Sequence, residues 1–126
     1  MKAKFYICKH CGNIIEIVKD AKVPMMCCGE KLHLLEPNTV EASGEKHLPA
    51  VSVEGNKVKV NVGTVQHPMA EEHFIEWVYV ETEKGGMRKH LNPGEEPIVV
   101  FDLGEDKPIA VYAYCNLHGL WMTEIK

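Results

Sequence analysis

Apolar and polar residues alternate along most of the chain beyond about residue 50, which is the pattern of half-buried β-strands. The first such stretch, residues 51–62, has valines at alternate positions on both sides of Gly55-Asn56. A two-residue turn that begins with glycine predicts a β-hairpin with a type II′ turn. Further short apolar runs predict strands at residues 74–80, 87–91, 98–101, 109–114 and 120–125.

About seven short strands separated by turn residues predict an antiparallel β-sandwich, of the immunoglobulin-like type, over residues 41–126. Turn residues stand at Lys84-Gly85-Gly86 and Asn92-Pro93-Gly94, and no stretch has a convincing helical period of 3.6 residues. On the strand that ends near residue 115, alternation places Val111, Ala113 and Cys115 on one face. We therefore expect the Cys115 sulfur to face the interior of the sandwich.

The first 36 residues are organised differently, around four cysteines and one short predicted strand at residues 14–18. We interpret residues 1–36 as a separate small domain and Pro37-Asn38-Thr39-Val40 as the linker, so the domains are 1–36 and 41–126, joined by 37–40. A unit of this size rarely buries enough apolar surface to fold alone. Metal ligation is expected to supply most of its folding free energy.

Composition and charge exclude several classes of protein. The 126 residues carry 14 Lys and Arg against 18 Asp and Glu, a formal charge of -4, with no basic run. This argues against a nucleic-acid partner. No window approaches the roughly 18 apolar residues of a membrane span, and the N-terminal residues lack the apolar run of a signal peptide. We expect a cytoplasmic protein with no membrane contact.

Four of the five cysteines form a metal-ligand pattern, in which fifteen residues separate Cys8 and Cys11 from the adjacent pair Cys27 and Cys28. An odd number of cysteines without a secretion signal favours reduced thiols over a disulfide framework, although two disulfides remain the competing interpretation. Four thiolates suit a tetrahedral iron or zinc ion. The adjacent pair must splay apart, unlike a zinc ribbon. The pattern resembles desulforedoxin, a small rubredoxin-like domain, and this resemblance implies iron.

A second candidate site centres on Tyr114-Cys115-Asn116-Leu117-His118-Gly119, where a thiolate and an imidazole can reach one ion across a single turn. His47, His67 and His73 lie upstream in turn-like or strand-edge sequence. On one strand His67 and His73 would be about 20 Å apart, so they can share an ion only if residues 68–72 form a loop. We expect edge-exposed imidazoles around one buried thiolate. Taken singly, each histidine is as readily a solvated or core imidazole, and Cys115 a small apolar residue.

These motifs together resemble the superoxide reductase family, which includes desulfoferrodoxin and neelaredoxin, and the likeness spans nearly the whole chain. The stretches that carry it are Glu45-Lys46-His47-Leu48-Pro49, His67-Pro68-Met69 with His73 beyond it, and residues 114–119. With all four N-terminal cysteines present, the two-iron form is implied.

The resemblance implies a mononuclear iron with four equatorial imidazoles, an axial thiolate, a carboxylate that can take the sixth position when the iron is oxidised, and a lysine over the open face. These groups would be His47, His67, His73 and His118, then Cys115, Glu45 and Lys46. His10, His33 and His90 match no motif and are assigned to the surface.

The implied function is one-electron reduction of superoxide to hydrogen peroxide, with re-reduction by a donor such as rubredoxin, in a homodimer. An ammonium group beside an open position attracts a small anion and stabilises developing negative charge, which favours an enzyme over a pure carrier. Two other functions stay open, an iron electron carrier without turnover and a structural zinc knuckle on a β-sandwich binding module. Metal analysis and a visible spectrum would separate the three.

Overall fold

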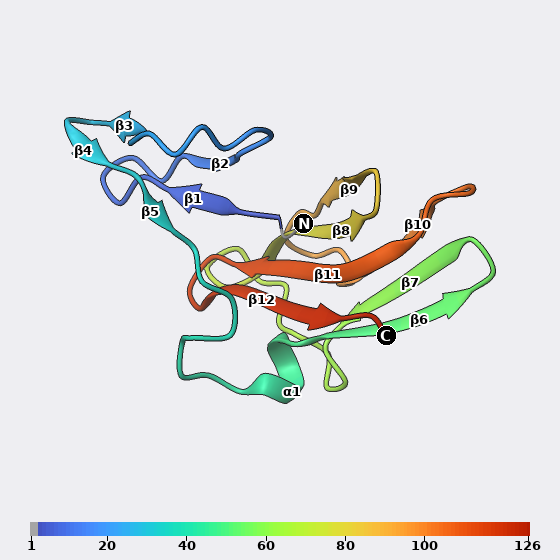
Figure 1. Cartoon of the computed structure of the whole chain (residues 1–126). Helices are drawn as coiled ribbons and strands as arrows, with labels where there is room; N and C mark the ends of the chain where they lie inside the picture. Colours follow the sequence, from blue (N-terminus) through green and yellow to red (C-terminus); the bar gives the residue numbers. More distant parts are fainter. Residues whose placement is uncertain (1–2) are drawn as a thin grey trace. The chain divides into compact units, whose positions relative to one another are not determined.

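The computed structural model describes residues 3–126, so the first two residues of the predicted 1–36 domain lie outside the described part. The chain divides into two compact units, of which the first ends at Glu36 and the second runs from Pro37 to Lys126 (Figure 1). The residues predicted as a linker group with the second unit. Within residues 3–126 no helix is long and apolar enough to cross a membrane.

The first unit is a small all-β knuckle with almost no apolar core. Its strands are β1 (Phe5–Ile7), β2 (Ile14–Glu16), β3 (Met26–Cys27), β4 (Glu30–Lys31) and β5 (His33–Leu34), arranged as a β2-β1-β5 sheet and a β3-β4 hairpin. Among its described residues only Phe5 and Cys8 are buried. This little burial cannot offset the entropy of ordering the chain, which agrees with a fold that depends on metal ligation.

The second unit is a sandwich of two antiparallel sheets, which confirms the predicted fold class. One sheet has the order β10-β7-β6 and the other the order β12-β11-β8-β9. The strands are β6 (Pro49–Glu54), β7 (Lys57–Val62), β8 (Ile75–Thr82), β9 (Gly85–His90), β10 (Ile98–Asp102), β11 (Pro108–Cys115) and β12 (Gly119–Glu124). The turn between β6 and β7 has Gly55 at φ +59°, as the first position of a type II′ turn requires.

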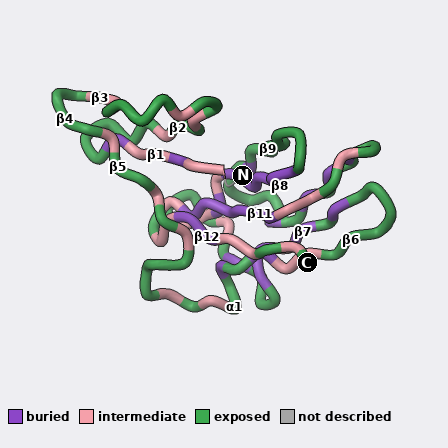
Figure 2. The backbone as a smooth tube through the Cα atoms, viewed as in Figure 1, coloured by how far each residue is buried: buried purple, intermediate pink, exposed green. Residues whose placement is uncertain are grey.

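The core of the second unit lies on the facing sides of β7, β8 and β11, which are the buried stretches in Figure 2. Val58 and Val60 of β7 are fully buried, and so are Val78 of β8 and Val111 of β11. Each such side chain contributes about 1.5 kcal/mol or more by leaving water. Cys115 belongs to this core with none of its surface exposed, so the prediction that its sulfur faces the interior is confirmed.

Two of the irregular features in this unit lie at the candidate ligands. The pairing of β8 with β11 shifts between Tyr114, opposite Trp77, and Cys115, opposite Ile75, which leaves one extra residue in β8. Such a bulge redirects side chains at the end of a strand. The second feature is α1 (Gly44–His47), a four-residue helix that the sequence did not predict because it is barely longer than one turn.

Candidate metal centres

The four cysteines of the first unit converge on one point. Their sulfur atoms all lie within 4.8 Å of one another, with Cys11 and Cys27 at 3.7 Å and Cys27 and Cys28 at 3.9 Å. A tetrahedral ion with metal–sulfur distances of about 2.3 Å sets its ligands about 3.8 Å apart. These separations therefore match a tetrahedral metal site. All four cysteines are free thiols, as ligation requires.

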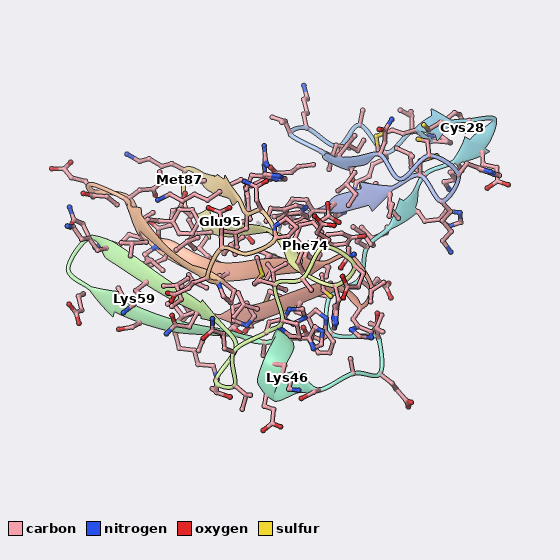
Figure 3. The ribbon with its side chains drawn as sticks, turned by 180° about the vertical axis from the view of Figure 1, so that it is seen from behind. Cys28, Lys46, Lys59, Phe74, Met87 and Glu95 are labelled. Carbon is pink, nitrogen blue, oxygen red and sulfur yellow. The ribbon has the colours of Figure 1, made fainter. Side chains whose placement is uncertain are left out.

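The adjacent cysteines can reach one point because the backbone is left-handed at the second cysteine and at the glycine that follows it. Cys28 has a φ of +54° and Gly29 a φ of +76°, both left-handed. A non-glycine residue in this region carries a conformational cost. Here that conformation lets Cys27 and Cys28 splay towards the same ion; Figure 3 labels Cys28 in this unit.

The electrostatics of this cluster also favour a cation. Hydrogen bonds from the backbone N–H groups of Cys11 and then His10 lower the pKa of Cys8 to about 6. The hydrogen bond with Cys8, and after it the one with Cys11, raises the pKa of Cys28 to about 12. One thiolate therefore suppresses ionisation of its neighbours, and four thiolates can coexist only around a positive ion.

The second cluster is a closed ring of four imidazoles in the sandwich unit. Successive ring centroids lie 4.5 Å (His47 to His67), 4.7 Å (His67 to His73), 5.1 Å (His73 to His118) and 4.9 Å (His118 to His47) apart. The opposite rings of His47 and His73 are 6.3 Å apart. Neighbouring rings are almost perpendicular, at 78° to 84°. This is the arrangement of four ligands in the equatorial plane of one ion.

The distances between ring nitrogens fit an ion at the centre. The Nε2 atom of His47 lies 3.0 Å from Nε2 of His67 and 3.1 Å from Nδ1 of His118. Two nitrogens bound at right angles, each about 2.1 Å from a metal, would be about 3.0 Å apart. The match places these three nitrogens at neighbouring corners of a coordination square.

The protonation state of two of the rings also indicates a cation at the centre. Nδ1 of His47 donates to the Ser43 carbonyl and Nδ1 of His67 to the Pro68 carbonyl, each at 2.7 Å. Burial is the main cause that lowers the pKa of both imidazoles, that of His67 to about 4, so the rings are neutral and their Nε2 atoms carry lone pairs. Two lone pairs facing each other at 3.0 Å repel unless a cation lies between them.

Cys115 lies beside the ring at the end of β11. Its sulfur is within 4.8 Å of the ligand nitrogens of His47, His67 and His73, and 4.0 Å from Nδ1 of His118. Burial raises the pKa of this thiol, so a thiolate here needs a neighbouring cation. Among the described residues, Nε2 of His73 is a buried nitrogen without a hydrogen-bond partner. Five donors thus surround one position, and their chemistry fits a divalent or trivalent metal ion.

The structure brings these five residues together as the sequence suggested, with one difference. Residues 68–72 form a loop, so the condition for His67 and His73 to share an ion is met. The expectation of edge-exposed imidazoles is wrong for two rings, because His47 is 3% and His67 2% exposed. The indole of Trp121 stacks on His47 with centroids 4.9 Å apart, a tertiary contact that local sequence does not reveal.

Glu45 and Lys46 are exposed on α1, directly before the buried ligand His47 (Lys46 is labelled in Figure 3). Their helix rests on Gly63, a residue that the sequence analysis missed. The Val65 N–H donates to the Glu45 carbonyl at 2.9 Å, and a Cβ atom on Gly63 would lie 2.6 Å from that same oxygen. Only glycine fits beneath α1 without moving it.

The remaining histidines take no part in either cluster. His10 pairs with Glu30 at 3.1 Å on the surface of the first unit, and His33 and His90 are exposed on β5 and β9.

Two further residues that hold the ligands were also missed. The Trp121 indole N–H donates to the His118 carbonyl at 3.1 Å, so its side chain contacts two of the four imidazole residues. The Asn116 side chain bonds to the backbone on both sides of His73. Asn116 stood in the motif between Cys115 and His118, but the sequence carried no signal of what it contacts.

The Desulfoferrodoxin family model matches residues 39–124. The desulfoferrodoxin homolog of Archaeoglobus fulgidus is 45% identical, over 94% of each chain. The crystal structure of superoxide reductase from Treponema pallidum has a TM-score of 0.81 and 37% identity, covering 98% of this chain and 100% of that one. The one-iron superoxide reductase of Giardia intestinalis has a TM-score of 0.56 at 33% identity and covers 65% of this chain and 98% of its own.

Proposed function

The chain belongs to the desulfoferrodoxin family, and we propose that it is a superoxide reductase whose second unit converts superoxide to hydrogen peroxide at a mononuclear iron. The proposed ligands are His47, His67, His73, His118 and Cys115. The observation that carries the proposal is the ring of imidazoles, whose facing nitrogens at 3.0 Å and 3.1 Å need a central cation. A second iron, of the rubredoxin type, is proposed at Cys8, Cys11, Cys27 and Cys28.

The donor set of the second unit favours a reactive ion over a structural one. Structural zinc sites are closed tetrahedra with four ligands. Here four imidazoles and one sulfur make five donors, and an ion that they held in octahedral coordination would have one position left for a further ligand. Solvated imidazoles, or imidazoles that only fill the core, would not place their nitrogen lone pairs face to face. A pure electron carrier would not need the open position.

When bound, ferrous iron supplies the one electron that turns superoxide into peroxide. The neutral imidazoles of His47 and His67 add no negative charge to the site, and Cys115 adds one as a thiolate. We propose that Lys46, exposed on α1, attracts the superoxide anion and orients it at the open face. Glu45, the neighbouring carboxylate, would compete for the same position in the oxidised resting state.

Two protons must reach the reduced oxygens, since superoxide, one electron and two protons give H₂O₂. The Nδ1–H groups of His47 and His67 are held by backbone carbonyls and point away from the ring of nitrogens, so these imidazoles cannot deliver protons. We propose that both protons come from solvent water.

The family resemblance also supports proposals on the cellular setting. We propose re-reduction by a small electron-transfer protein such as rubredoxin, a homodimeric state, a cytoplasmic location and a role in detoxification under oxidative stress.

The experiment that tests the function measures products against a known flux of superoxide. The full-length protein should hold two irons and stay coloured when only the iron of the second unit is reduced, because ferric thiolate absorbs visible light. In that state it should form one peroxide for each superoxide consumed, with no oxygen released. A dismutase would release oxygen as well. An iron electron carrier would consume no superoxide, and the structural-knuckle alternative would show zinc and no visible absorption. Any of these three outcomes would refute the proposal.

A further inference from the structure

The pairing of β8 with β11 ends just beyond the bulge, where Cys115 lies opposite Ile75, yet its backbone hydrogen bonds continue for one more step. Beyond Cys115, the Asn116 N–H donates to the Phe74 carbonyl at 3.2 Å. The main chain then turns away into the loop that carries His118. A continuing strand would have offered an acceptor to the Phe74 N–H and a donor to the Glu72 carbonyl.

The Asn116 carboxamide provides both missing groups. Its Oδ1 accepts from the Phe74 N–H at 2.9 Å, and its Nδ2 donates to the Glu72 carbonyl at 3.1 Å. One side chain thus replaces the next residue of the strand. The two residues that it holds are those directly before and after His73.

The His73 ring has more need of such support than two of the other imidazoles. The His47 and His67 rings are fixed by Nδ1 hydrogen bonds to backbone carbonyls. For His73, Nε2 is the nitrogen left free for a metal, and among the described residues no hydrogen bond from its ring to a backbone carbonyl is seen, while its backbone pairs with Ala70 across a short loop. The direction of this ring therefore depends on the backbone that carries it.

We propose that Asn116 is a positioning residue that fixes His73 as an iron ligand. Because Asn116 lies between Cys115 and His118, its side chain ties the loop at residues 68–74 to the turn that holds those two ligands. The inference rests on the proposed iron site and adds to it a residue that touches neither iron nor substrate. Partners of this kind are typically worth about 10- to 100-fold in metal affinity.

The chain offers a matched control for the loss of these hydrogen bonds. The Asn38 side chain makes the same pair of contacts with Met122, accepting from its N–H at 2.8 Å and donating to its carbonyl at 3.1 Å. Neither residue is a neighbour in sequence of a proposed ligand. Asn38→Asp and Asn116→Asp each keep the acceptor oxygen and lose the amide donor, and aspartate tolerates the left-handed φ of +63° at position 38.

The experiment follows release of ferrous iron from the full-length holoprotein to a coloured chelator. We expect Asn116→Ala to speed release from the second site about tenfold or more, and Asn116→Asp to have an intermediate effect. Release from the four-cysteine site is the internal control and should not change. The ferric electron paramagnetic resonance spectrum of the second site should change in both Asn116 variants. Asn38→Asp should lower the unfolding temperature as much as Asn116→Asp does, with wild-type iron release and spectrum.

Several outcomes would overturn this inference. They are wild-type iron release in Asn116→Ala, or release from Asn38→Asp as fast as from Asn116→Asp. Failure of both Asn116 variants to fold, seen in tryptophan emission, would show a purely structural role. If the wild-type protein held iron only at the four-cysteine site, the proposed function itself would be refuted. If it held two irons and the Asn116 variants had wild-type iron release and spectrum, only the inference on Asn116 would be refuted.

Discussion

Gly63→Ala should weaken the proposed iron site without touching any ligand. A Cβ atom there would lie 2.6 Å from the Glu45 carbonyl oxygen and 2.8 Å from that of Leu48, and backbone atoms cannot move aside as a flexible side chain can. Real Cβ contacts essentially never fall below 3.0 Å, so α1 must move away from residue 63. Overpacking of this kind costs about 1–3 kcal/mol.

The displacement reaches the iron because His47 is the last residue of α1. Its Nε2 is 3.0 Å from one neighbouring ligand nitrogen and 3.1 Å from another, so a shift of a few tenths of an ångström opens the square. We expect iron affinity at the second site to fall about 10- to 100-fold, as for other residues that orient ligands. Thermal unfolding and chelator competition measure the two effects.

Gly44→Ala is the matched control on the same helix. Its Cβ would meet only the Leu48 side chain, at 3.5 Å, which is ordinary contact, and alanine favours helix more than glycine does. This variant should keep wild-type affinity and be equally or slightly more stable. If Gly63→Ala binds iron as tightly as Gly44→Ala does, the argument that Gly63 sets the position of α1 is wrong.

Three other predictions concern Lys46, Cys28 and Asp20. Lys46→Ala should lower the rate of superoxide consumption about tenfold and make that rate less sensitive to added salt. The reason is that a chain of charge -4 attracts the anion only through a local cation. An unchanged rate and salt dependence in pulse radiolysis would rule out steering by this lysine. Cys28→Ser should abolish the four-cysteine spectrum and leave most superoxide consumption in place, because the sandwich binds its iron independently; loss of both together would contradict two independent units. Asp20→Asn should destabilise the first unit near pH 7 and not at low pH. The hydrogen bond from the Lys22 N–H, and after it the one from Lys4, lowers the pKa of Asp20. The stability that this carboxylate gives the folded unit is therefore present above the unfolded pKa of about 3.9 and disappears as pH falls through the folded pKa. If Asp20→Asn lowered the stability equally at both pH values, this reasoning would be wrong.

The sandwich could be predicted from the sequence because its signals are local. Alternation with a period of two and turn residues between runs indicated each strand from β6 to β12. The four residues of α1 are too few to show a helical period. The bulge opposite Cys115 could not be predicted either, since register depends on the pairing of β8 with β11, distant in sequence.

The site was predictable in composition and not in geometry. Spacing paired Cys115 with His118 and showed that His67 and His73 need a loop between them, but the full set of five ligands was assigned by family resemblance. The burial of His47 depends on Trp121, and the direction of His73 on Asn116, both contacts between segments far apart in the chain. Such contacts follow from tertiary packing, which residue patterns within one strand or turn do not contain.

The two centres should respond differently to removal of iron. In the first unit, the described residues bury only Phe5 and Cys8, so ligation must hold the fold. In the second, ligands from α1, the loop at 68–74 and the end of β11 meet beside a core of fully buried valines. That core exists without the metal. Chelation should therefore unfold the first unit and leave the sandwich folded.

Tryptophan emission separates the two units, since Trp77 and Trp121 are the only tryptophans of the chain and both are buried in the sandwich. After exhaustive chelation we expect the emission maximum to stay at its folded wavelength, while amide exchange becomes fast in residues 3–36. The intensity can change, because the Trp121 indole stacks on the ligand His47. A red shift of the maximum to that of the denatured protein would show that the sandwich also needs its iron to fold, and that the facing imidazoles repel strongly enough to offset the burial of its core.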